Sequence, residues 1–169
     1  SSMTWSAAVM GLVGLMVRWR ESYLIDPEIG YIPVSNLYEV FILFSIMTGL
    51  IYLFYEAKYR SRALGGFVLL VISAAVAFLL WYSFERGAHE IQPLVPALQS
   101  YWMKIHVPAN FVGYGAFALA AMVGVVYLIR SAGEKKNPAG FAATRLPAFD
   151  QLDDLMYKSI ALGFGFFTI

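Results

Sequence analysis

The sequence LGGFVLLVISAAVAFLLWYSF, residues 64–84, decides the fold class. It contains no charged residue, and its only polar side chains apart from the aromatic ones are those of Ser73 and Ser83. A helix needs about 20 apolar residues to cross the hydrocarbon layer of a bilayer. This run is long enough, so the sequence predicts a transmembrane helix here rather than a segment of a globular core.

Further apolar runs lie on both sides of this one. They cover residues 3–17, 36–55 and 107–129, and a last one begins near residue 152. The first run is short and the last stops at Ile169, so we expect both to be incomplete parts of a longer membrane protein. The pattern predicts an all-α, polytopic membrane protein with about five transmembrane helices, which form a single region over residues 1–169.

The composition supports this class and excludes others. The chain is 60% hydrophobic and 14% charged, which is too apolar for a soluble domain of this length. A net charge of +1 offers no electrostatic field for nucleic acid, so no nucleic-acid partner is expected. There is no cysteine, which excludes disulfides, thiol chemistry and covalent attachment of haem to a cysteine of this chain.

The basic residues predict how the loops are oriented. The connections at residues 56–63 and 130–151 together hold seven Lys and Arg, and those at 18–35 and 85–106 hold four. Basic loops stay on the cytoplasmic side of a membrane. We therefore expect residues 56–63 and 130–151 to be cytoplasmic and residues 18–35 and 85–106 to lie on the outer face.

A junction at the end of the second outer loop holds His106, one of two histidines in the chain. Apolar and aromatic residues recur before it at helical spacing, which predicts a helix lying in the membrane interface; they are Leu94, Leu98, Tyr101, Trp102 and Ile105. Pro108 suits the first turn of the following span, and Val107 is expected to be extended before it. His106 is therefore expected at the entry to that span, beside aromatic side chains.

Two interpretations of His106 remain open from spacing alone. A neutral imidazole is a frequent haem ligand, and aromatic neighbours such as Trp102 supply a wall for the porphyrin. An interfacial histidine that hydrogen-bonds to backbone or water is the commoner case, and spacing alone favours it. His89 is expected to be a solvated loop residue, and Glu39 is expected to pair with the helix dipole at the start of its span.

Four stretches of the chain resemble one known family. They are PVSNLYE at residues 33–39, IQPLVPALQSYW at 91–102, KIHV at 104–107 and GFGFFTI at 163–169. Together they resemble the CcsA/ResC family, called CcsB in some bacteria, which is the membrane subunit of the system II machinery for cytochrome c biogenesis. The resemblance runs from about residue 18 to the end of the chain.

This resemblance implies a function in handling haem. The family carries haem b to an outer site on a tryptophan-rich segment and presents it to apocytochrome c, where thioether bonds form to two cysteines. Two outer histidines ligate the haem iron, and the first of them lies at the position of His106. The second histidine and the tryptophan-rich segment are expected beyond Ile169. A ResB-type subunit, apocytochrome c, haem and the lipid bilayer are the expected partners.

The expected function is therefore part of a haem-attaching cytochrome c synthase complex in the bacterial inner membrane, with His106 on the periplasmic face. Residues 1–169 alone are not expected to be active. Two other classes stay open, namely a transporter or channel without a cofactor and a structural membrane scaffold. A channel needs polar residues along a path, and residues 64–84 offer only two serines besides aromatic side chains.

Overall fold

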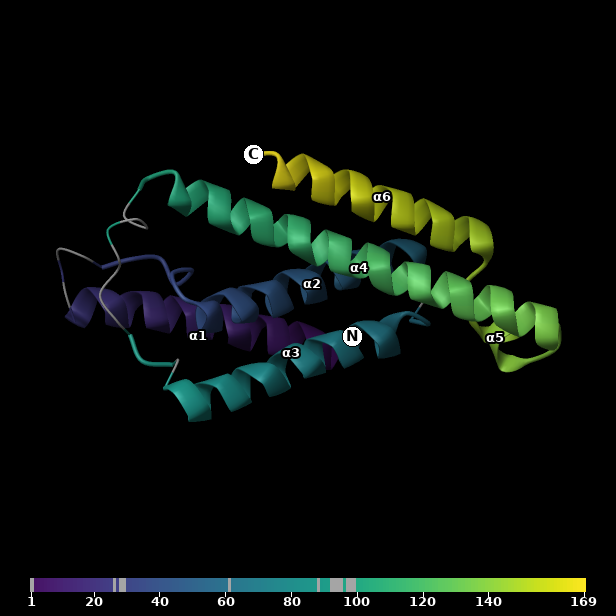
Figure 1. The fold of residues 1–169 in the computed structure, drawn as a ribbon, viewed down its shortest axis with the longest axis horizontal. Helices are drawn as coiled ribbons and strands as arrows, with labels where there is room; N and C mark the ends of the chain where they lie inside the picture. Colours follow the sequence, from purple (N-terminus) through teal and green to yellow (C-terminus); the bar gives the residue numbers. More distant parts are fainter. Residues whose placement is uncertain are drawn as a thin grey trace.

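The computed structural model describes residues 2–25, 27, 30–60, 62–87, 89–91, 96 and 100–169. Regular structure in these residues is helical, which confirms the predicted all-α class (Figure 1). The helices are α1 (Ser2–Ile25), α2 (Leu37–Tyr59), α3 (Gly65–Arg86), α4 (Met103–Lys136), α5 (Phe141–Arg145) and α6 (Phe149–Phe167).

Three helices among the described residues are long and apolar enough to cross a membrane. They are α2, α3 and α4, whose most apolar windows have mean hydropathies of 2.0, 2.3 and 2.1. Only 17% of the α3 window is buried within the protein, so most of that helix faces its surroundings, as lipid-exposed helices do. The predicted membrane character is supported, whereas the predicted number of about five spans is not confirmed.

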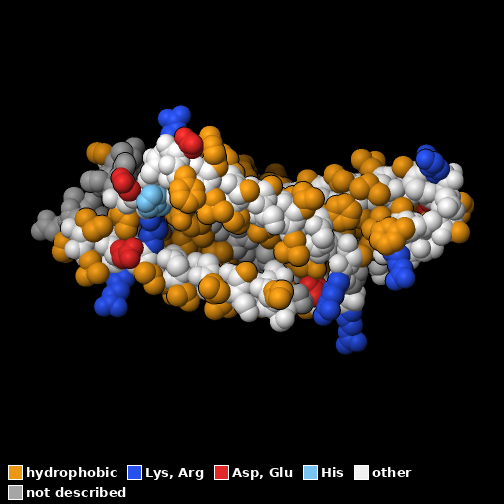
Figure 2. All heavy atoms as spheres, turned by 90° about the horizontal axis from the view of Figure 1, so that it is seen from below, with side chains coloured by type: hydrophobic (Ala, Val, Ile, Leu, Met, Phe, Trp, Pro, Cys, Tyr) orange, Lys and Arg blue, Asp and Glu red, His pale blue; other side chains and the backbone are white. Residues whose placement is uncertain are grey.

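The helices form a bundle in which α2 and α4 make most of the contacts. Helix α2 packs against α1, α3 and α4, and α4 packs along α6 on its other side. The last turns of α1 and α3 and the first turns of α2 and α4 lie at one end of the bundle, on the left in Figure 1, and the last turns of α2 and α4 and the first turns of α3 and α6 lie toward the other. Figure 2 shows hydrophobic side chains along the length between these ends. The helix ends that flank residues 26–36 and 87–102 therefore lie opposite those that flank residues 60–64 and 137–148, as the alternation of spans requires.

Several helix boundaries differ from the sequence expectations, including the end of α4, which lies at Lys136 rather than near residue 129. Helix α1 continues to Ile25, so part of the predicted first outer loop is helical. Helix α4 begins at Met103, which places Pro108 inside the helix and makes Val107 helical rather than extended. A proline there removes the N–H that would bond to the carbonyl of Lys104, an exposed residue in the first turn, where the loss of one bond is tolerated.

Buried side chains form two clusters, one toward each end of the bundle. The larger, toward residues 60–64, joins α2, α3, α4 and α6 around Val68, Leu119, Val123, Val126 and Leu152. The smaller cluster, here called the outer-end cluster after the orientation predicted from the basic residues, consists of Leu15, Val34, Leu43 and Ile46. Met103, Val107 and Phe111 of α4 pack against it. The start of α4 is therefore held by α1, α2 and the loop between them.

Glycines allow α4 to approach two neighbours closely. A Cβ atom at Gly113 would lie 3.1 Å from the carbonyl oxygen of Gly163, and one at Gly163 would lie 2.7 Å from the ring of Phe117. A Cβ atom at Gly115 would lie 3.2 Å from the backbone nitrogen of Thr48 in α2. Small residues thus set the spacing of α4 against α6 and α2, as they do at many contacts between membrane helices.

Candidate functional site

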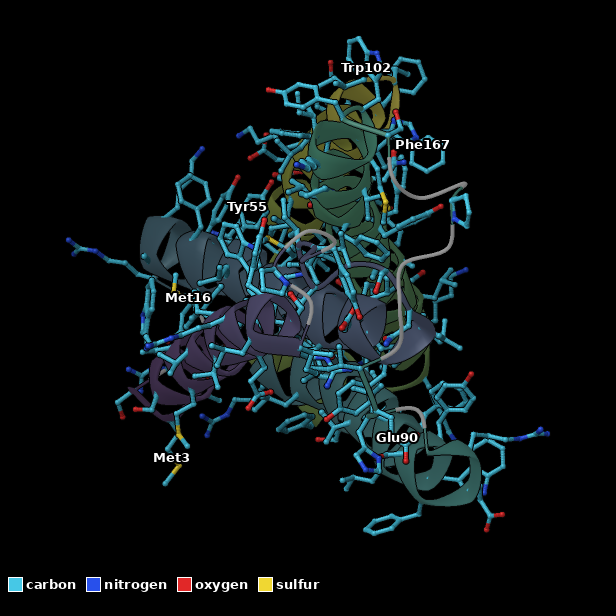
Figure 3. The ribbon with its side chains drawn as sticks, turned by 90° about the vertical axis from the view of Figure 1, so that its left-hand side faces the viewer. Met3, Met16, Tyr55, Glu90, Trp102 and Phe167 are labelled. Atoms are coloured by element: carbon cyan, nitrogen blue, oxygen red, sulfur yellow. The ribbon has the colours of Figure 1, made fainter. Side chains whose placement is uncertain are left out.

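Trp102 and His106 form an exposed stripe at the start of α4, and His106 is the predicted haem ligand. The backbone N–H of His106 donates to the carbonyl of Trp102 at 2.8 Å, so the two side chains lie one helical turn apart on one face. The indole of Trp102 is 70% exposed, and the His106 side chain is exposed as well. Figure 3, which views the bundle from the end with loops 26–36 and 87–102, shows Trp102 projecting away from the helices.

Asn110 continues this stripe and holds the imidazole. Its amide Nδ2 lies 2.8 Å from Nε2 of His106, four residues earlier. The Asn110 Oδ1 atom is buried and has no hydrogen-bond partner among the described residues. Whichever way the amide is turned, it bonds the ring through Nε2. The other ring nitrogen, Nδ1, has no partner in the described part of the chain.

The donor set suits a haem better than a bare metal ion. No group of three or more His, Asp or Glu among the described residues is placed to hold a metal ion. His106 is then a single protein donor, and a porphyrin supplies the remaining equatorial donors of its own iron. The exposed indole of Trp102 offers a flat apolar surface one turn away. The residues present therefore fit one axial face of a haem.

The packing of a neighbouring face of the first α4 turns explains why this stripe is exposed. Met103 and Val107 pack against the outer-end cluster and are half-buried, whereas His106 projects from a neighbouring face. The apolar contacts fix the rotation of the helix about its axis, and the rotation in turn determines where the imidazole points. The position of His106 thus depends on the packing of its immediate neighbours.

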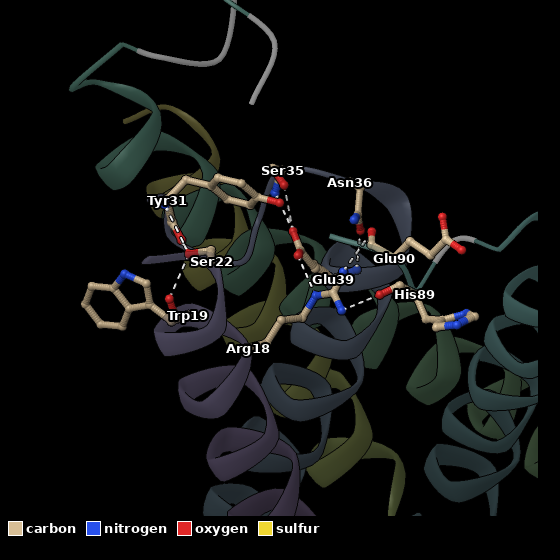
Figure 4. Close-up of polar contacts among 9 residues, drawn as sticks. All are labelled: Arg18, Trp19, Ser22, Tyr31, Ser35, Asn36, Glu39, His89 and Glu90. Carbon is tan, nitrogen blue, oxygen red and sulfur yellow. Dashed lines mark hydrogen bonds and ion pairs between the residues drawn. The ribbon is translucent and has the colours of Figure 1, made fainter. Parts of the chain in front are cut away.

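A buried ion pair at the same end of the bundle was not predicted from the sequence (Figure 4). Glu39 is fully buried, and its Oε1 atom accepts from Nε of Arg18 at 2.6 Å. Its Oε2 atom accepts from the backbone N–H of Ser35 at 2.9 Å and from the Ser35 hydroxyl at 2.8 Å. Both carboxylate oxygens therefore have partners, which a buried charge requires.

Glu39 lies in the first turn of α2, as expected for pairing with the helix dipole, and the structure adds a charged partner. Asn36 caps α2, since its Oδ1 accepts from the Glu39 backbone N–H at 2.9 Å. The partner Arg18 lies 21 residues earlier, on α1. The sequence signal that could have revealed it is an arginine at the outer end of one apolar run facing a carboxylate at the outer end of the next.

Arg18 also contacts the loop that leads toward α4. Its Nη1 atom donates to the carbonyl of His89 at 2.5 Å, and Nη2 donates to the carbonyl of Glu90 at 3.3 Å. The guanidinium lies 5.4 Å from the centre of the Tyr38 ring, within the range of a cation–π contact. One arginine thus connects α1, α2 and the residues that follow α3.

The loop before α2 is tied to α1 by a second contact. The hydroxyl of Ser22, which is buried, lies 2.7 Å from the carbonyl of Trp19 and 3.1 Å from that of Tyr31. The backbone N–H of Tyr31 lies 3.2 Å from the same hydroxyl oxygen. These contacts hold the loop against the last turns of α1.

His89 keeps the minor role expected for it. Its side chain is exposed, and Nδ1 lies 2.9 Å from the hydroxyl of Ser83. Only its backbone carbonyl enters the network around Arg18.

Leu94 and Leu98, on which the predicted interfacial helix depends, lie outside the described residues, so that helix stays a prediction. Trp102 and Tyr101, at its end, are 70% and 72% exposed.

Comparison with known proteins gives a consistent set of matches. The model of a family described as cytochrome C assembly protein matches residues 34–169. A relative from Chlamydomonas reinhardtii, named cytochrome c biogenesis protein CcsA, is 30% identical over 161 residues, which cover 92% of this chain and 41% of the relative. Proteins of the same name from Guillardia theta and Porphyra purpurea are 28% and 26% identical; the matches cover 92% and 83% of this chain and 54% of each relative.

The chain therefore spans about half the length of these curated relatives, or less. The matched family region includes the loop with Ser35, the buried Glu39 and the stripe with His106, whereas Arg18 precedes it. No solved structure matches the chain significantly.

Proposed function

We propose that this chain, which belongs to the cytochrome c assembly protein family, acts in cytochrome c biogenesis by binding haem b at the outer face of the membrane and presenting it to apocytochrome c. It would do so as part of the membrane subunit of a system II cytochrome c synthase. The observation that best supports this proposal is the exposed imidazole of His106, which lies one turn after the exposed indole of Trp102. Both residues lie at the start of a helix that is long and apolar enough to cross a membrane.

In this proposal the protein holds haem without a covalent bond. When bound, haem supplies an iron that takes axial ligands and a porphyrin edge that forms thioethers with cysteines. His106 would donate one axial nitrogen, and Trp102 would form part of the wall. Because the chain contains no cysteine, it cannot form thioethers itself, and the haem stays free to pass to the cysteines of the acceptor.

A single donor does not complete the axial coordination of a haem iron. We propose that a second histidine, outside residues 1–169, supplies the other axial ligand. A ResB-type subunit is proposed as the partner that completes the complex. Both parts of the proposal rest on the resemblance of the chain to the CcsA/ResC family, since the described residues provide one histidine at the site.

The proposed location is the bacterial inner membrane, with His106 on the periplasmic face. Two observations support this orientation. The excess of basic residues lies in connections 56–63 and 130–151, which predicts a cytoplasmic position for that end. The first turn of α4, with His106, lies at the opposite end of the bundle (Figure 1).

A transporter or channel has less support. A path through the membrane needs polar side chains along its length. Helix α3 offers only the hydroxyls of Ser73 and Ser83 besides its aromatic residues in its apolar part. A purely structural scaffold, in turn, gives no reason for an exposed imidazole beside an exposed indole. Neither alternative is favoured by a specific contact.

The function is tested by cytochrome c maturation. The full-length protein is produced with its ResB-type partner and a reporter apocytochrome c, and covalently bound haem is measured on the reporter by haem staining. His106→Ala is expected to abolish maturation, and His89→Ala is the matched control because His89 is also an exposed outer-loop histidine. Normal maturation with His106→Ala, at equal protein level, would overturn the proposed site.

A further inference from the structure

We infer that the Arg18–Glu39 ion pair is a positioning device that fixes His106 for haem binding by holding both ends of loop 87–102. This inference rests on the proposed function, because it concerns the same imidazole. Among the described residues, no hydrogen bond or ion pair joins Arg18 or Glu39 to Trp102 or His106, so the effect must be transmitted through the contacts described below.

The first end of the loop is held by Arg18 directly. Its guanidinium bonds to the carbonyls of His89 and Glu90 while its Nε bonds to Glu39. A guanidinium has five N–H donors in a rigid fork, which allows it to serve a carboxylate and two carbonyls at once. A lysine offers a single point charge and does not reproduce this arrangement.

The second end is held through the other oxygen of the same carboxylate. Glu39 Oε2 accepts two hydrogen bonds from Ser35. The neighbouring Val34 is buried in the outer-end cluster, against which Met103 and Val107 pack. The start of α4 therefore rests on a loop that Glu39 helps to hold in place, together with the contacts of Ser22.

In the sequence, His106 lies between Met103 and Val107, the two residues that pack against the outer-end cluster. Met103 precedes it by three positions and Val107 follows it directly, so a shift of the outer-end cluster would turn or move the imidazole. The pair itself is well shielded, since the side chain of Glu39 is fully buried and that of Arg18 is 13% exposed. Removing one partner of such a pair leaves an uncompensated buried charge, which its surroundings must rearrange to solvate.

The test measures haem binding by the full-length protein with its partner subunit in detergent. Glu39→Gln keeps the size of the side chain and removes its charge, and Arg18→Lys keeps the charge and removes the fork. Both are expected to weaken haem binding about 10–100-fold, the range typical of residues that support a metal ligand. Both are also expected to shift the reduction potential of the haem, which a general loss of stability does not do.

The matched control is the ion pair at the opposite end of the bundle. Arg62 Nε lies 3.0 Å from Oε1 of Glu56, whose side chain is 11% exposed. Glu56→Gln therefore also removes a largely buried charge, far from the proposed haem site. It is expected to leave haem affinity and reduction potential unchanged. Should Glu39→Gln fail to fold, Arg18→Lys is the milder variant on which the comparison is made.

The outcomes separate this inference from the proposed function. If His106→Ala loses haem while Glu39→Gln and Arg18→Lys keep the wild-type affinity and potential, the positioning role is wrong and the haem site stands. An equal loss with Glu56→Gln would also overturn it, because the effect would then be general. If His106→Ala binds haem normally, the proposed site fails, and the inference fails with it.

Discussion

Nε2 of His106 lies 2.8 Å from Nδ2 of Asn110, one turn further along α4. A histidine that ligates a metal usually bonds through its other ring nitrogen to a second group, which fixes the orientation and tautomer of the ring. Asn110 can take this role because its amide offers either a donor or an acceptor to the imidazole. The orientation of the proposed ligand is therefore set within its own helix.

Asn110→Ala is expected to weaken haem binding about 10–100-fold, because the ring loses the group that orients it. Asn110→Asp is expected to retain binding, since a carboxylate still accepts a hydrogen bond from a ring N–H. The measurement is a haem titration of the purified full-length protein, followed by absorbance. Ser83→Ala is the control, because it removes the equivalent partner of His89. Wild-type affinity of Asn110→Ala would show that the contact does not support the ligand.

The orientation of the bundle can be measured with single introduced cysteines, because residues 1–169 contain no cysteine of their own. Tyr101→Cys and Phe141→Cys place one thiol each at opposite ends, at positions that are 72% and 75% exposed. A membrane-impermeant maleimide added to intact cells is expected to label residue 101 and to reach residue 141 only after the membrane is opened. Labelling in the reverse order would contradict the proposed location of His106.

Gly163→Leu is expected to destabilise the packing of α6 against α4. A Cβ atom there would already lie 2.7 Å from the Phe117 ring, and overpacking of this kind costs about 1–3 kcal/mol. Gly165→Leu is the matched control on the same helix, because a Cβ atom at Gly165 meets nothing within 4 Å. Thermal unfolding in detergent is expected to show a lower midpoint for the first variant alone. Equal midpoints would contradict the close approach.

Thr48→Val is expected to stabilise the protein. Thr48 is fully buried in α2, and its hydroxyl oxygen has no hydrogen-bond partner among the described residues. An unpaired buried polar group costs about 1–3 kcal/mol, and valine replaces it with an apolar group of similar shape. Ser45→Ala, which removes a hydroxyl that donates to the carbonyl of Phe41 at 2.8 Å, is expected to give no such gain. A lower unfolding midpoint for Thr48→Val would contradict this interpretation of the site.

Much of the fold followed from local sequence signals. The apolar run at residues 64–84 corresponds to α3 (Gly65–Arg86), and Glu39 lies in the first turn of α2 as predicted, because both depend on neighbouring residues alone. The start of α4 was placed too late, since the rule that a proline begins a helix gave Pro108 more weight than the favourable packing of Met103 before it. Tertiary contacts here outweigh a local preference.

The candidate site was only partly predictable. His106 and Trp102 were identified from their spacing and from family resemblance, and the structure places them one turn apart on an exposed face. The partnership of Arg18 with Glu39 was missed, because it joins residues on different helices and depends on how α1 lies against α2. Haem ligation itself stays a prediction.

The most direct test of the account is the absorbance of haem in the full-length protein with His106→Gly, purified with its partner subunit. The account predicts that the Soret band of bound haem is lost and that added imidazole restores it, because the free ligand fills the space left by the missing side chain. A Soret band of wild-type position and intensity in His106→Gly, without imidazole, would contradict the assignment of His106 as the axial ligand.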